Sequence, residues 1–185
     1  STDIGPGNCL IDKWIKKNFD KDFDRDGKIS LEGKVNINLA DNFLNKLKKS
    51  QKNKNISYDT SDFNLLEFNK LNPKDGVATL SFITAKAILN FAKDLDLKRI
   101  IICGGGRLNQ AILNNLKKDR FIISLMEDVK SSQSDDPIWN LNGDFIESQA
   151  FAYIAVRSLL KLPISFPETT GCNKPCTGGV IIENF

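Results

Sequence analysis

The sequence predicts an α/β fold in which helices flank a sheet that includes parallel strands. Two apolar runs, 99–103 and 121–126, have the length and composition of buried strands. Segments in which apolar residues recur at helical spacing precede, separate and follow these runs. This order of helix, strand, helix, strand and helix is typical of layered α/β proteins. With 185 residues, 41% of them hydrophobic, the chain can form one globular domain or one lobe of a larger enzyme.

Six segments are predicted to be helical. The helix at 77–95 is the clearest, because Leu80, Ile83 and Ala87 recur at spacings of three and four. Asn8 is a suitable N-cap for the first helix. The predicted helices are 9–17, 41–49, 62–71, 77–95, 109–118 and 144–161. The predicted loops are 19–30, 53–61, 131–142 and the tail after residue 163, which ends in a short strand at 180–182.

Composition narrows the range of functions. A net charge of +3 is too small to indicate nucleic acid, and the lysine-rich stretch 47–55 lacks aromatic residues for base stacking, so we interpret it as a solvated loop. No apolar run approaches the roughly 18–20 residues that span a bilayer, so no membrane partner is predicted. The chain has no histidine, which excludes Ser-His-Asp triads and HExxH zinc sites. A general base must therefore be a carboxylate, a lysine, a tyrosine or a cysteine.

The four cysteines are scattered along the chain, and we interpret them as the reduced thiols of a cytoplasmic protein. Cys172 and Cys176 lack a second spaced pair, which argues against a zinc site. The loop DFDRDGKISLEG places Asp22, Asp24 and Asp26 at EF-hand positions, but its twelfth position is a glycine instead of the bidentate glutamate. We interpret this loop as an acidic surface turn, and no metal ligand is predicted.

Three glycines, Gly104, Gly105 and Gly106, follow the first predicted strand and precede a helix. Glycine lets a ligand approach the backbone closely, and ligands of α/β sheets bind at the carboxyl ends of strands. A helix N-terminus also favours anionic groups. The segment matches neither the GxGxxG fingerprint nor a P-loop. It predicts nucleotide contact, and the alternative is a tight turn without a ligand.

Two carboxylates are candidates for the chemistry. Asp3 stands two residues ahead of the turn Gly5-Pro6-Gly7, whose amides can face phosphate while the carboxylate takes a proton. On these residues alone, a simple turn is the alternative. Glu147 lies beside the apolar stripe of the helix at 144–161, where it is either a solvated flank or a site residue.

Several of these motifs occur together in one family. They are GPGN-x-L-x-D-x-W at 5–14, VATLSFITA at 77–85, CGGGRLN at 103–109, GDFIESQAFAYIAVRSL at 143–159 and LPISFPETTG at 162–171. In this order and over almost the whole chain, the sequence resembles the 1,6-anhydro-N-acetylmuramic acid kinases.

The resemblance implies the ribonuclease H-like fold of sugar kinases and actin, with two α/β lobes around a cleft. It implies that residues 1–185 are the C-terminal lobe, an actin-like mixed sheet flanked by helices. The family is about twice as long, and its Gly-Thr-Ser-x-x-Gly phosphate loop has no counterpart here. This chain is therefore expected to be inactive without the missing N-terminal lobe. The family also suggests a homodimer.

The implied reaction is ATP-dependent phosphorylation of 1,6-anhydro-N-acetylmuramic acid with hydrolytic opening of the anhydro bridge. It yields N-acetylmuramic acid 6-phosphate and ADP in cytoplasmic peptidoglycan recycling, and Mg²⁺ accompanies ATP. By resemblance, Asp3 is the catalytic residue that takes a proton from the attacking water, and Glu147 and Asn8 bind the sugar. The residues implied on the nucleotide side are Gly5, Gly7, Gly104, Gly105, Gly106 and Asn109.

The sequence departs from the family in two places. Many members have a Pro-Lys-Ser segment followed by an arginine, and 55–63 has neither the lysine nor the arginine. The polar insertion at 131–142 can alter the rim of the site. Two alternatives stay open: a non-catalytic sugar- or nucleotide-binding module, and a kinase of the same superfamily with another substrate.

Overall fold

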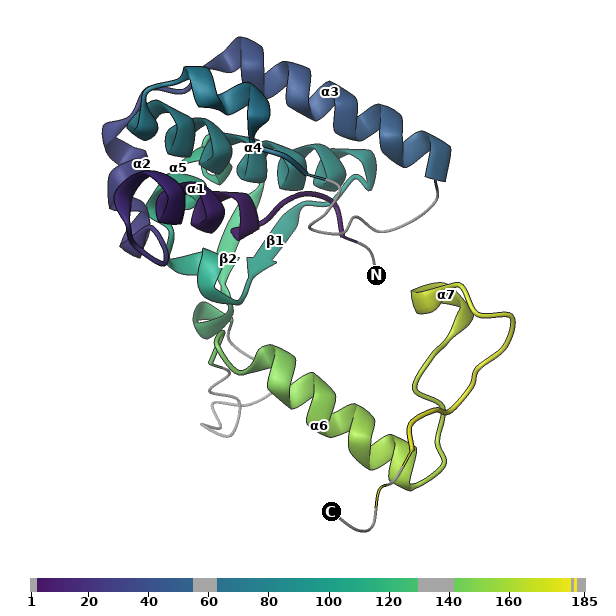
Figure 1. Ribbon diagram of the computed structural model, residues 1–185. Helices are drawn as coiled ribbons and strands as arrows, with labels where there is room; N and C mark the ends of the chain where they lie inside the picture. Colours follow the sequence, from purple (N-terminus) through teal and green to yellow (C-terminus); the bar gives the residue numbers. More distant parts are fainter. Residues whose placement is uncertain (1–2, 55–62, 130–141, 181, 183–185) are drawn as a thin grey trace.

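The computed structural model describes residues 3–54, 63–129, 142–180 and 182 (Figure 1). Helices and strands alternate as predicted for an α/β protein. With η for a 3-10 helix, the elements are α1 (Cys9–Phe19), η1 (Arg25–Gly27), α2 (Lys28–Glu32), α3 (Ile37–Lys54), η3 (Leu66–Lys70), α4 (Pro73–Asp94), β1 (Arg99–Ile102), η4 (Gly105–Leu108), α5 (Gln110–Leu116), β2 (Ile122–Leu125), η5 (Met126–Asp128), α6 (Ile146–Leu159) and α7 (Pro167–Thr170).

Helix α4 is the centre of the molecule, and α1, α2, α3 and α5 all pack against it. It begins at Pro73, four residues before the predicted start, because Asn72 caps it by accepting a hydrogen bond from the Lys74 N–H at 3.0 Å. Gly76 lets α1 approach, since a Cβ there would lie 2.3 Å from Trp14 Cζ2. The Trp14 Nε1 donates to the Pro73 carbonyl at 2.7 Å, which fixes α1 on α4.

Aromatic rings from α3, η3 and the segment before η3 pack together beside Trp14 of α1. Phe68 lies edge-on to Trp14, with ring centroids 6.4 Å apart, and to Phe43 at 5.9 Å. Phe63 stacks on Phe43 at 6.3 Å. These contacts hold η3 and α3 against α1, the helix that carries the first motif.

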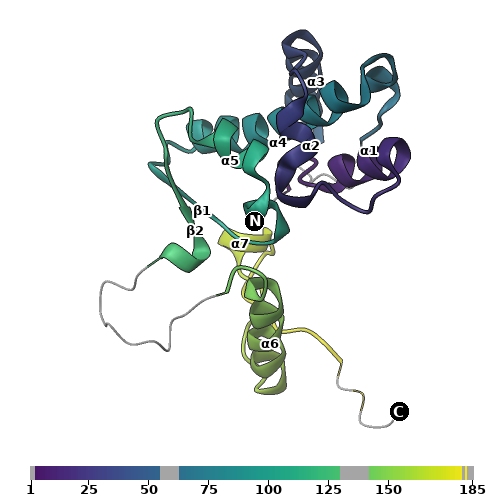
Figure 2. The same ribbon diagram turned by 90° about the vertical axis from the view of Figure 1, so that its left-hand side faces the viewer.

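The two strands pair in parallel, with Ile100 opposite Ile123 and Ile101 opposite Ser124. Ile100, Ile102 and Ile123 pack against the core, whereas Ile101 and Ile122 on the other face are 46% and 56% exposed. The prediction of buried strands is therefore wrong, because the helices cover one face only (Figure 2). A mixed sheet was expected. In the described residues, the sheet instead consists of these two parallel strands.

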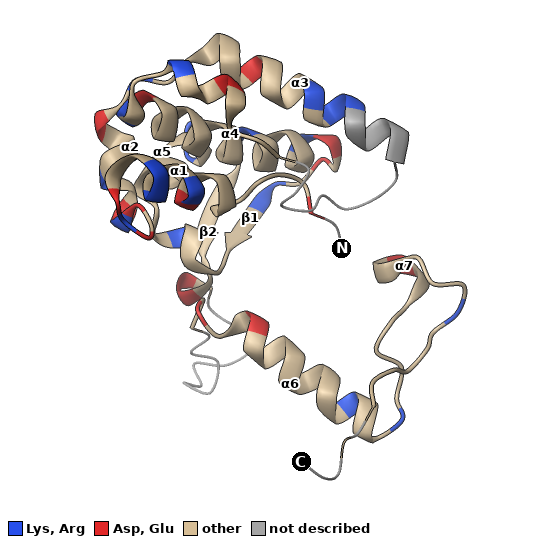
Figure 3. Cartoon of the chain, in the orientation of Figure 1, with Lys and Arg blue, Asp and Glu red and all other residues tan. Residues whose placement is uncertain are grey.

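Helix α6 extends away from the helices and the sheet (Figure 1), and none of its residues is buried. Phe151 and Tyr153 are 64% and 62% exposed. Between Glu147 in its first turn and Arg157 in its last, it carries no charge, as Figure 3 shows. The stripe predicted to be buried is thus exposed in this structure. Across the described residues, no helix is both long and apolar enough to cross a membrane.

Several predicted loops are helical. Residues 25–32 form η1 and α2, and α3 continues through the lysine-rich stretch to Lys54. The tail contains α7. A strand was predicted at 180–182, but the described residues Val180 and Ile182 do not form a strand. Residues 55–61 of the loop predicted at 53–61, and residues 131–141 of the insertion, lie outside the described residues. All four cysteines are free thiols, and Cys103 is exposed, not in a buried strand.

Candidate active site

The turn Gly5-Pro6-Gly7 is held on α4. A Cβ on Gly5 would lie 2.9 Å from the Ala87 Cβ, so only glycine allows this close approach. Gly7 has a positive φ of 52°, and its carbonyl accepts a hydrogen bond from Thr84 Oγ1 at 2.8 Å. The turn leads directly into α1, because the Cys9 N–H donates to the Pro6 carbonyl at 3.1 Å. Asp3 lies just before this turn and its side chain is exposed.

The glycines after β1 form an open backbone. Gly104 has a φ of 72°, and a Cβ on Gly104 or Gly105 would have no atom within 4 Å. Gly106 is different, because a Cβ there would lie 3.6 Å from both Oδ1 and Nδ2 of Asn8. The side chain of Asn8 therefore brings the opening turn beside the glycines, although about one hundred residues separate them in the sequence.

Asn8 occupies the N-cap position of α1, as predicted, but its side chain makes no capping hydrogen bond. Its Oδ1 atom is buried and has no hydrogen-bond partner among the described residues. A buried acceptor without a partner is costly, and such atoms are often satisfied by a ligand or water. Asn8 is therefore the described side chain best placed to accept a hydrogen bond from a bound molecule.

Asn109 has a structural task that the sequence did not reveal. It is 5% exposed, and its Oδ1 accepts from the N–H groups of Ala111 at 3.0 Å and Ile112 at 3.2 Å. It is thus the N-cap of α5, which begins one residue later than predicted. Its contact with nucleotide stays a prediction.

A cavity of about 430 Å³ lies where these elements meet. It is lined from α1, from the η1 loop and from η4. Its lining residues are Asn8, Ile11, Asp12, Asp22, Phe23, Asp24, Arg25, Asp26, Gly105, Leu108 and Asn109. Of the predicted site residues, this cavity unites Asn8, Gly105 and Asn109.

Asp12 is a wall residue that the sequence reasoning did not select. Burial raises the pKa of its carboxyl, and the nearby charge of Asp24 raises it further. The spacing in the sequence could have indicated Asp12, because it follows Asn8 by four residues and a helix places both on one face.

In the acidic loop, Asp24 is already engaged in hydrogen bonds within the chain. The Asp24 carboxylate, 6% exposed, accepts from the N–H groups of Ile29 and Ser30 at 2.9 Å and from Ser30 Oγ at 2.7 Å. It therefore stabilises the start of α2. In the part of the chain that is described, no three His, Cys, Asp or Glu side chains gather to hold a metal ion.

Glu147 lies in the first turn of α6 and is exposed. It does not line the cavity, but the residues just before it are attached to the glycines. The Gly104 N–H donates to the Gly143 carbonyl at 2.9 Å. The structure thus links Glu147 to the candidate nucleotide side through a short segment of chain.

Comparison with known proteins identifies the family of the chain. The family model described as anhydro-N-acetylmuramic acid kinase matches residues 1–184. The chain belongs to this family. A Pelagibacter ubique protein named anhydro-N-acetylmuramic acid kinase is 38% identical over the whole of this chain and 49% of its own length. Proteins of the same name from Brucella canis and Zymomonas mobilis are 38% and 37% identical, over 98% and 97% of this chain and 47% of their own length.

The family assignment confirms the resemblance seen in the motifs. The chain spans about half the length of the curated relatives it matches. The anhydro-N-acetylmuramic acid kinases are carbohydrate kinases, and ATP use follows from that class of reaction.

Proposed function

We propose that this chain is the C-terminal lobe of an anhydro-N-acetylmuramic acid kinase. The complete enzyme transfers the γ-phosphoryl group of ATP to the 6-oxygen of 1,6-anhydro-N-acetylmuramic acid while water opens the anhydro bridge. The products are N-acetylmuramic acid 6-phosphate and ADP, formed in the cytoplasm during peptidoglycan recycling. The observation that carries the proposal is the meeting of two family motifs, at Asn8 and Gly106, beside one cavity.

The nucleotide side is assigned to the two glycine turns. Gly5 and Gly7 present backbone next to the N-terminus of α1, where oriented N–H groups favour phosphate. Gly104 and Gly105 leave backbone open to a ligand. Gly106 and Asn109 shape the adjoining wall, and Mg²⁺ accompanies the phosphates. In this assignment the backbone of the glycine turns, and not charged side chains, contacts the anion; the Gly104 N–H does not take part, because it donates to the Gly143 carbonyl.

The sugar side is assigned to Glu147 and Asn8, and the base to Asp3. Asp3 is exposed ahead of the phosphate turn, where a carboxylate can take a proton from the water that attacks the anomeric carbon. The chain has no histidine to compete for this role. Asn8 supplies a buried amide oxygen without a partner among the described residues.

A second lobe is part of the proposal. Parallel sheets are normally covered on both faces, yet Ile101 and Ile122 are exposed here. A helix that is apolar on all sides is normally buried, yet α6 has no buried residue. The relatives are about twice as long as this chain. These three observations support an N-terminal lobe that covers α6 and the open face of the sheet. Homodimer formation stays a prediction.

The test is a coupled assay of ADP release with 1,6-anhydro-N-acetylmuramic acid, ATP and Mg²⁺. It is run on this chain alone, and on this chain mixed with the half of the Pelagibacter ubique relative that it does not match. Turnover in the mixture and none in either part alone supports the kinase lobe. A folded and associated mixture that shows no turnover contradicts it.

The binding-module alternative is favoured by one observation, which is that the cavity is formed entirely within this chain. Calorimetry with ADP and with the anhydro sugar separates the two functions. Binding by the chain, with no turnover in the associated mixture, would establish the module. Turnover with another sugar would instead establish a different substrate.

A further inference from the structure

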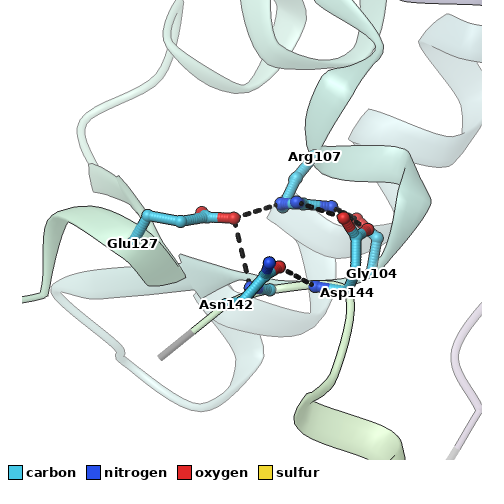
Figure 4. A network of polar contacts seen from close by, with 6 residues as sticks. Gly104, Arg107, Glu127, Asn142 and Asp144 are labelled. Atoms are coloured by element: carbon cyan, nitrogen blue, oxygen red, sulfur yellow. Dashed lines mark hydrogen bonds and ion pairs between the residues drawn. The ribbon is translucent and has the colours of Figure 1, made fainter. Parts of the chain in front are cut away.

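One buried arginine joins the glycine turn to the segment that begins α6. Arg107 is 6% exposed and lies in η4, directly after Gly106. Its Nε donates to Glu127 Oε1 at 2.6 Å, and its two terminal nitrogens donate to the Asp144 carboxylate at 2.5 and 2.9 Å. A fourth hydrogen bond runs from Nη1 to the Gly104 carbonyl at 3.2 Å. Figure 4 shows the guanidinium between these groups.

Backbone contacts close the same network. Gly104 donates its N–H to Gly143 at 2.9 Å, and Gly143 donates its own N–H to Glu127 Oε1 at 3.1 Å. Gly143 has no room for a side chain, since a Cβ there would lie 2.6 Å from Arg107 Nε. The ends of β1 and β2 and the start of α6 are therefore held by one side chain. This matters because α6 has no buried residue that could fix its direction.

We propose that Arg107 is a positioning residue that fixes α6, and with it Glu147, relative to the glycine turn. We call the hydrogen bonds of Arg107 to Gly104, Glu127 and Asp144 the Arg107 clamp. The effect of the clamp on turnover rests on the proposed function, whereas the existence of the clamp does not. Arg107 does not need to touch a ligand, because its donors are already directed at Gly104, Glu127 and Asp144. Its action is to set the distance between the nucleotide side and the sugar side.

The geometry requires a guanidinium. Arginine presents donors in a planar fork that can serve a carboxylate in bidentate fashion and a second acceptor at once. The ammonium of lysine is a single point of donation and cannot reproduce the fork. A positive charge alone is thus insufficient to form this network of hydrogen bonds. Arg107→Lys, which keeps the charge and removes the planar fork, therefore tests the proposal.

The first experiment measures amide hydrogen exchange by NMR in this chain. Arg107→Met and Arg107→Lys are expected to speed exchange at Gly104 and Gly143 by about tenfold or more, with α4 unchanged. Arg120→Met is the matched control, because Arg120 is exposed and pairs only loosely with Asp96 at 3.7 Å. Unchanged exchange at both glycines in Arg107→Met would overturn the proposal. Exchange at the wild-type rate in Arg107→Lys would also overturn it.

A second variant covers the case in which Arg107→Met fails to fold, seen as faster exchange throughout α4. Asp144→Asn keeps the side-chain shape at a carboxylate that is 52% exposed. It is expected to speed exchange at Gly104 and Gly143 by about threefold or more, because it weakens a charge-assisted pair. No change at these amides would overturn the clamp.

The second experiment uses the assembly with the other half. Arg107→Lys is expected to raise KM for the sugar about tenfold while changing KM for ATP less than about twofold, since Glu147 is displaced and the glycines remain. Equal losses for both substrates would indicate a general structural role and overturn the positioning role. Absence of turnover in the wild-type assembly would refute the proposed function, and the exchange measurement would still decide the clamp.

Discussion

The side chain of Asn8 lies against Gly106, and a Cβ on that glycine would be 3.6 Å from both Oδ1 and Nδ2 of the asparagine. This contact joins the first motif of the chain to the glycines after β1. It also leaves Asn8 Oδ1 buried with no partner in the described part of the structure. The contact therefore defines both a structural junction and a candidate ligand position.

Asn8→Ala is expected to leave the free energy of unfolding within about 1 kcal/mol of the wild type, because the lost acceptor makes no hydrogen bond to a described residue. The affinity for 1,6-anhydro-N-acetylmuramic acid is expected to fall about tenfold, because Asn8 is assigned to the sugar side. Urea unfolding and calorimetry measure the two effects. Asn109→Ala is the matched control and should lose about 1 kcal/mol, since it removes the cap of α5. A large stability loss in Asn8→Ala would show that this amide is structural.

The glycines should separate into structural and binding positions. Gly5→Ala is expected to destabilise the fold by about 1–3 kcal/mol, because its Cβ would press on Ala87. Gly105→Ala has open space and should change stability by less than about 0.5 kcal/mol. It should nevertheless weaken ADP binding about tenfold, since a methyl group covers the open backbone. Unaltered ADP affinity in Gly105→Ala would exclude nucleotide from this turn.

Asp3→Asn tests the proposed base. In the assembly with the other half, turnover is expected to fall by about 10²–10⁴-fold, because an amide cannot take the proton from water. The fold should be retained, as judged by circular dichroism, because the Asp3 side chain is exposed. Substantial remaining turnover would refute the assignment of Asp3.

The Arg107 clamp should weaken in acid. The hydrogen bonds from Arg107 hold the pKa of Asp144 below its ordinary value. A depressed pKa contributes stability above the unfolded value of about 3.9, and this contribution is lost as pH falls through the folded value. Exchange at Gly143, corrected for its intrinsic pH dependence, should stay constant from about pH 7 to 5 and rise below about pH 4. The pKa of Glu127, which accepts from the Gly143 N–H, is also held below its ordinary value, by its own backbone N–H and by Arg107. Asp144→Asn should therefore reduce this rise, and an unchanged rise in the variant would assign it to Glu127.

Helix α6 should be needed for association more than for the fold of this chain. Phe151→Asp replaces a side chain that is 64% exposed, so the unfolding free energy should change by less than about 0.5 kcal/mol. Association with the other half should weaken at least tenfold, because a charge would be buried in an apolar contact. Analytical ultracentrifugation measures this. Leu66→Asp, at 73% exposed on η3, is the control and should leave association unchanged.

The local sequence determined most of the helices, both strands and the family of this protein. Helical spacing predicted α1, α4, α5 and α6, and two apolar runs predicted β1 and β2. The ordered motifs identified the family, which the comparisons confirmed. These features depend on neighbouring residues, whose spacing records which face of an element is apolar. The helix α2 was missed because the N–H groups in its first turn are satisfied by Asp24, a residue that is itself buried by tertiary packing.

Only the tertiary structure decided how the candidate site is arranged. It placed Asn8 beside Gly106, assigned Asn109 to a helix cap and joined Arg107 to Glu127 and Asp144. It also showed that one face of β1 and β2 is exposed and that no residue of α6 is buried, although both are apolar in sequence. Apolar periodicity states which residues favour burial, but which surface covers them is a long-range property of the folded chain.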